Sequence, residues 1–132
     1  MKEELITFET AKLAKEKGFD EVTDINYYED YNYKLESNFN GLKHSDGNNY
    51  FISAPTQSLL QKWLRDKHNI HIQCEVRVTY GEYKKSFVNL YQMNVFTISG
   101  DMKNHTTFTG NYNTYEEALE AGLVEALKLI KL

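Results

Sequence analysis

The chain has 132 residues, a formal net charge of −4 and one cysteine. This length predicts a single domain, 1–132, that buries about two-thirds of its unfolded surface, and a lone cysteine argues against a fold that depends on disulfides. No apolar run approaches the length of a membrane span and the first residues lack the apolar region of a signal peptide, so we expect a cytoplasmic protein without membrane contact.

The negative charge is concentrated near the N-terminus. Residues 1–33 contain nine acidic residues and four lysines, a balance of −5, which leaves +1 for the rest of the chain. Phosphate binding depends on clustered lysine and arginine. The charge distribution therefore makes nucleic acid an unlikely partner.

The N-terminal part, 1–53, gives the weaker pattern. A short helix is expected over 7–17, with Thr7 as its cap and Gly18 as its stop. Residues 20–53 have no clear period, and a hairpin of 31–37 with 49–53 is one arrangement that the pattern allows. Because its apolar face is thin, we expect the helix over 7–17 to dock less firmly than the other helices.

The clearest unit is a helix that leads directly into a strand. Leucines and Trp63 form one helical stripe, Pro55 suits the first turn, and Asn69 suits a left-handed stop. The period then changes to two. The face predicted to be buried carries Ile70, Ile72, Cys74, Val76, Val78 and Tyr80, and the polar face carries His71, Gln73, Glu75, Arg77 and Thr79.

Two more strands and a helix complete the chain. Residues 86–100 read as a strand with apolar side chains on both faces, so the pattern does not show which face is buried. Residues 105–110 read as a third strand. Thr114 and Glu117 form a capping box at the start of a helix with an unbroken apolar stripe.

These elements predict an α+β fold. Its core, 54–132, has the order α-β-β-β-α from residue 55 onward, with a three-stranded or slightly larger antiparallel sheet and helices packed on one face. The short N-terminal helix is an extra element.

Three segments carry a resemblance to a known family. The strings ITFETAKLAKEKGFDE, APTQSLLQKWLRDKHNIHI and YEEALEAGLVEALKLI resemble a family of small uncharacterised proteins from gut bacteria and their phages, over about a third of the chain. That family has no assigned activity. The resemblance implies a soluble cytosolic protein, of phage origin in one reading, and implies nothing about mechanism.

The order of elements is also similar to that of double-stranded RNA-binding domains. Their second helix opens with lysines that bind phosphates across the major groove. Here that helix opens with Glu116 and Glu117, which would repel phosphate. An RNA-binding module that uses Arg77, Lys84 and Lys85 is therefore an alternative interpretation, not the leading one.

No enzymatic or metal chemistry is assembled in the sequence. A metal or catalytic site on the polar sheet face would combine His71, Glu75 and His105, but a solvated polar face explains these residues better. Cys74 has no histidine on its own face, and the seven glycines form no phosphate loop. We predict no catalytic residue, no metal and no cofactor.

One unusual stretch remains, the acidic tyrosine stretch of residues 20–33. Tyrosine gives large contact area at low entropic cost, and uncompensated carboxylates suit a basic partner. The competing interpretation is that the rings pack back on the sheet while the acids stay solvated. The leading hypothesis is a non-enzymatic protein-interaction module that is a monomer or a weak homodimer, and one interpretation makes it a phage accessory protein. Its predicted contacts are Asp24, Tyr27, Tyr28, Glu29, Asp30 and Tyr31.

Overall fold

The protein is described by a computed structural model that covers residues 4–21, 23–28, 34–42, 51–81, 86–99 and 102–131. These ranges form an α+β structure, as the sequence predicted. The elements are α1 (Phe8–Glu16), β1 (Thr23–Tyr28), β2 (Lys34–Leu42), β3 (Phe51–Ser53), α2 (Gln57–His68), β4 (Ile70–Gly81), β5 (Ser86–Ser99), β6 (Met102–Phe108) and α3 (Tyr115–Lys128).

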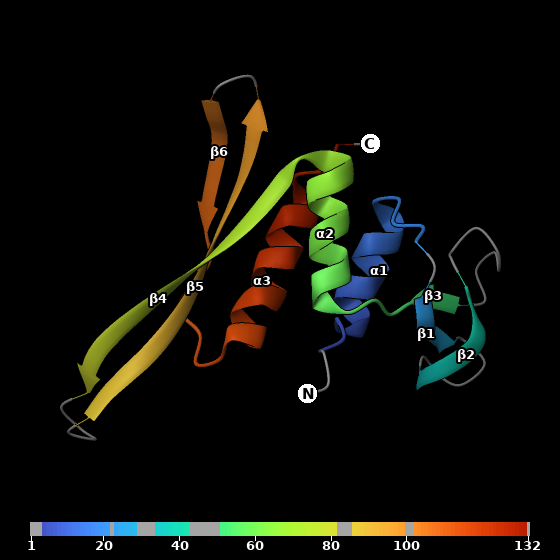
Figure 1. The fold of residues 1–132 in the computed structure, drawn as a ribbon, viewed down its shortest axis with the longest axis horizontal. Helices are drawn as coiled ribbons and strands as arrows, with labels where there is room; N and C mark the ends of the chain where they lie inside the picture. Colours follow the sequence, from blue (N-terminus) through green and yellow to red (C-terminus); the bar gives the residue numbers. More distant parts are fainter. Residues whose placement is uncertain are drawn as a thin grey trace.

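The strands form two antiparallel sheets on either side of the helices (Figure 1). One sheet has the order β2-β1-β3 and the other has the order β4-β5-β6. The predicted hairpin of 31–37 with 49–53 is wrong, because β1 lies between β2 and β3 and pairs with both. Part of the acidic tyrosine stretch thus forms the central strand of the small sheet.

Each helix begins with the same device, a threonine hydroxyl that accepts a backbone N–H three residues later. Thr7 Oγ1 accepts from Thr10, Thr56 Oγ1 from Leu59, and Thr114 Oγ1 from Glu117, at N···O distances of 3.3, 3.2 and 3.1 Å. The predicted caps at Thr7 and Thr114 are confirmed.

The stop after α2 is also confirmed. Asn69 has a φ of 53°, the left-handed conformation that turns the chain straight into β4. The Asn69 side chain secures this corner, since its Nδ2 donates to the Ile98 carbonyl and its Oδ1 lies 2.9 Å from His71 Nε2. Pro55, by contrast, precedes the cap Thr56 and lies outside the helix, so its predicted place in the first turn is wrong.

Helix α3 packs on β4 and β5 at very short range because of one glycine. A Cβ at Gly122 would lie 3.1 Å from Met93 Cβ and 3.2 Å from Ile72 Cγ2. Fully buried leucines of α2 and α3 complete this layer, together with Val95 of β5. The packing of α3 on β4 and β5 is therefore a central part of the core.

Polar contacts of Glu120 join α3 to the other two helices. One Glu120 carboxylate oxygen accepts from the Thr7 backbone N–H at 3.2 Å, and the other accepts from Gln57 Nε2 at 3.1 Å. Gln57 Nε2 also donates to the Glu116 carbonyl at 2.9 Å. The first turns of α1 and α2 are thereby held against α3.

The predicted buried face of β4 is covered for only part of its length. Ile70 and Ile72 are buried and Cys74 is half-buried, whereas Val76, Val78 and Tyr80 are 54, 61 and 54% exposed. The prediction of one buried face is therefore wrong for these last three residues. The physical reason is visible in Figure 1, where β4 and β5 project as an arm beyond the end of α3.

The close approach at Gly122 makes a testable prediction. Gly122→Leu should lower the free energy of unfolding by about 1–3 kcal/mol, even though leucine favours helix, because the added side chain must displace Met93 and Ile72. The control Lys128→Leu, on the exposed side of the same helix, should change it by about 0.5 kcal/mol or less. Urea denaturation measures both, and equal effects of the two substitutions would contradict the packing described.

Candidate functional site on the projecting arm

The arm carries most of the exposed large apolar side chains of the described residues. Five such side chains are at least 40% exposed, and four of them lie together on one face of the arm or beside it. We define the arm patch as these four and the two half-buried residues that connect them: Cys74, Val76, Val78, Tyr80, Tyr91 and Tyr115. Soluble proteins rarely expose a contiguous group of large apolar side chains to water unless the group is a site of interaction with another molecule.

The patch exists because α3 starts where it does. The backbone of Tyr112 exchanges two hydrogen bonds with that of Tyr91, at 2.8 and 2.9 Å, and so fixes the chain against β5 just before the helix. Tyr115, the first residue of α3, then packs edge-on against the Tyr91 ring with 6.4 Å between ring centroids. Beyond this point no helix among the described residues covers the face.

The two titratable groups that join the arm to α3 are neutral. Burial, and then the neighbouring Glu75 carboxylate, raises the pKa of the Cys74 thiol. Burial also raises the pKa of Tyr115, and the Cys74 and Glu116 charges add to the effect. Both groups therefore keep their protons at neutral pH, and they add no charge to the end of the patch next to α3.

The other face of the arm is polar and carries residues of the alternative hypotheses. Glu75 and Arg77 are exposed there, and His71 stacks on Phe96 with 5.4 Å between ring centroids. No group of three metal-ligating side chains occurs among the residues that the structure describes. His105 lies on β6, but its side chain is outside the described part, as are Lys84 and Lys85 altogether.

The partner contacts predicted from the sequence separate into two groups. Tyr27 is only 9% exposed, packs on Phe8 and donates its hydroxyl to the Ile6 carbonyl at 3.0 Å. This burial argues against its predicted role in binding a partner, because β1 turns this ring toward α1. Asp24 and Tyr28 lie on β1 with side chains that are not described, and Glu29, Asp30 and Tyr31 fall outside the described residues. For these five, partner binding stays a prediction.

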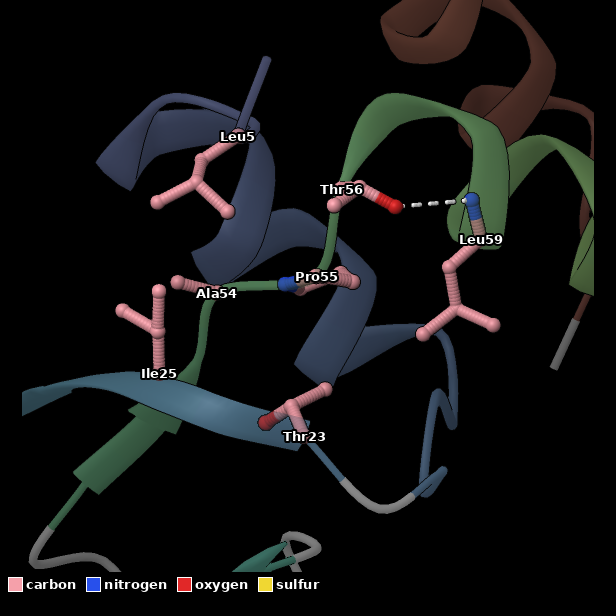
Figure 2. Close-up of a pocket in the computed structure, with 7 residues that line it drawn as sticks. All are labelled: Leu5, Thr23, Ile25, Ala54, Pro55, Thr56 and Leu59. Carbon is pink, nitrogen blue, oxygen red and sulfur yellow. Dashed lines mark hydrogen bonds between the residues drawn. The ribbon is translucent and has the colours of Figure 1, made fainter. Parts of the chain in front are cut away.

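A small pocket lies apart from the arm, between β1 and the start of α2 (Figure 2). Its volume is about 230 Å³, below the range of about 300–1,000 Å³ typical of ligand sites. Its polar side chains are the hydroxyls of Thr23 and Thr56, and Thr56 is occupied in capping α2. The pocket therefore offers no group for acid–base chemistry. The lining residues are Leu5, Thr23, Ile25, Ala54, Pro55, Thr56 and Leu59.

Comparison with known proteins adds no assignment to this geometry. No family model, no curated protein and no solved structure matches the chain. Among the described residues, no helix combines the length and the apolarity needed to cross a membrane. The arm patch is therefore interpreted from its own residues, and the resemblance to small bacterial and phage proteins stays a prediction.

The chemistry of Cys74 provides one prediction. Because its pKa is raised, the thiol should react with iodoacetamide more slowly than a free cysteine near neutral pH, and the rate should keep rising with pH above the range of an ordinary thiol. Glu75→Gln removes the second cause of the shift and should increase the rate modestly. The control Glu117→Gln should leave it unchanged. Mass spectrometry follows the reaction, and a rate above that of a model peptide would contradict the described environment.

The buried Tyr27 provides another prediction. Burial, and then Glu120 and Glu9, raises its pKa above the usual value of about 10. As the pH rises through the usual tyrosine pKa, the unfolded chain loses the hydroxyl proton that the folded protein keeps. The contribution of Tyr27 to stability is therefore present below this pH and is lost as the pH rises above it. Tyr27→Phe should cost about 1 kcal/mol at neutral pH through the lost hydrogen bond, and its stability should fall less steeply in alkali.

Urea unfolding over a series of pH values measures this difference. The control is Gln73→Ala, which changes an exposed side chain without an ionisable group and should leave the steepness of the alkaline loss as it is. Parallel pH curves for wild type and Tyr27→Phe would contradict the role given to Tyr27.

Proposed function

We propose that the protein is a non-enzymatic protein-interaction module that contacts its partner through the arm patch. The observation that carries this proposal is the exposure of Val76, Val78 and Tyr80 on one continuous face. Aromatic and apolar side chains dominate the energetics at the centres of protein interfaces, and covering this face would remove it from water.

The construction of the arm supports the same function. The strands of the arm pair without a register shift from Ile70 to Gly81, so the patch is presented on a regular hairpin. Valine has a stiff side chain, and ordering it at an interface costs little conformational entropy. Tyr115 fixes one end of the patch to the core. The arm is thus a preorganised surface.

The acidic tyrosine stretch becomes a secondary contact surface in this proposal. Its remaining predicted residues, Asp24, Tyr28, Glu29, Asp30 and Tyr31, suit a basic partner. The arm patch is preferred because Val76, Val78 and Tyr80 are each more than half exposed. Arg77, on the opposite face of the arm, keeps the RNA-binding alternative open to the same experiment.

Photo-crosslinking in cells tests the proposal. With p-benzoylphenylalanine in place of Val78, irradiation should give protein adducts, because this side chain lies at the centre of the proposed interface. The same replacement at Lys12, an exposed position on α1, should give few. Adducts that nuclease shortens would favour the RNA-binding alternative, and the absence of adducts specific to Val78 would overturn the proposed function.

A further inference from the structure

Among the described strands, β4 is paired on one side only, and the hydrogen bonds of β5 show which backbone groups of β4 face the other side. Met93 N–H donates to Thr109 Oγ1 and Met93 C=O accepts from Thr109 N–H, both at 2.9 Å. Tyr91 makes its two backbone bonds with Tyr112. These two residues of β5 therefore direct their N–H and C=O groups away from β4.

The opposite residues of β4 must then direct theirs away from β5. Cys74 lies opposite Met93, and Val76 lies opposite Tyr91. In an antiparallel ladder, residues that do not bond one another point their backbone groups outward. Among the described strands only β5 pairs with β4. The N–H and C=O groups of Cys74, Val76 and Val78 consequently face an edge that another strand can join.

One end of this edge is closed. Gln61 Nε2 of α2 donates to the Ile72 carbonyl at 3.1 Å, which occupies the outward acceptor next to the core. A joining strand can therefore pair from Cys74 outward along the arm. The edge that remains runs from Cys74 to Gly81, and in its first five residues, Cys74–Val78, apolar residues alternate with Glu75 and Arg77.

The charges of this segment select a register for self-pairing. If two copies of β4 pair antiparallel about Val76, Glu75 of each copy lies opposite Arg77 of the other. A centre at Glu75 or at Arg77 places like charges opposite each other, and a centre at Cys74 or Val78 pairs neither charge with its opposite. Opposite charges directly across an antiparallel pair stabilise it, and like charges destabilise it.

We propose that the partner of the arm patch is a second copy of this chain, joined edge to edge through β4 with Val76 opposite Val76. This inference rests on the proposed function. Cys74 of each copy pairs with Val78 of the other, so the two arm patches form one apolar surface on one face of a continuous sheet. Both charge pairs fall at positions that do not exchange hydrogen bonds, where opposing side chains are closest.

Charge reversal tests the register. Glu75→Arg alone and Arg77→Glu alone each place like charges opposite one another twice, and each should weaken self-association by about tenfold or more. The double variant Glu75→Arg, Arg77→Glu should return the dissociation constant to near the wild-type value. Both positions are exposed, so the fold should persist, which circular dichroism checks.

Mixing the two single variants gives the matched control. One copy of each restores opposite charges at both pairs, so the mixture should associate more tightly than either variant does alone. Sedimentation velocity over a range of concentrations measures these equilibria. Hydrogen exchange supplies a second readout, since the N–H groups of Cys74, Val76 and Val78 should gain protection as concentration rises.

The outcomes separate this inference from the proposed function. Wild-type protein that sediments as a monomer at every concentration, or charge variants that associate as wild type does, would overturn the pairing. Photo-adducts of Val78 with a different protein would then still support an interaction module. Adducts of twice the mass of the chain support the pairing.

Discussion

The close packing of α3 against β4 and β5 at Gly122 is the constraint on which the rest of the structure depends. With hydrogen in place of a side chain, the helix approaches Met93 and Ile72 directly. Leu123 and Leu127 of α3 are then fully buried, and Glu120, about one turn before Leu123, reaches Thr7 and Gln57 on the other helices. Helix α3 therefore sets the position of the β4-β5-β6 sheet and of the helices α1 and α2.

The same contact leaves the arm bare. A strand rises about 3.3 Å per residue and a helix about 1.5 Å, so the 12 residues of β4 extend about 40 Å while the 14 residues of α3 extend about 21 Å. Helix α3 packs over the first residues of β4. The part of β4 that α3 covers therefore stops at Tyr115, the N-terminal residue of the helix. The exposure of Val76 and Val78 thus follows from the lengths of α3 and β4 and from their contact at Gly122.

The helices and the corner at Asn69 could be predicted from local chemistry, because a threonine cap or a left-handed asparagine needs only its neighbours in sequence. The extent of the buried face could not, because alternation shows which side chains of β4 share a face and not what lies over it. Comparing the length of the strand at 70–81 with that of the C-terminal helix would have predicted that the end of the strand extends beyond the helix. Tyr27 is a similar case: its burial depends on Phe8 and Ile6, which reach it only through the tertiary fold.

An open strand edge beside an apolar face is a hazard that proteins must manage. In β4 the segment Cys74–Val78 contains no proline and no lysine, and its two charges have opposite signs at positions two apart. Such charges oppose most registers of another strand but complement the same strand turned about Val76. A pairing of this kind occupies the β4 edge of both copies at once, so along β4 it ends with two copies instead of continuing into a fibre. The charges that would protect the edge from other strands are then the ones that define its proposed partner.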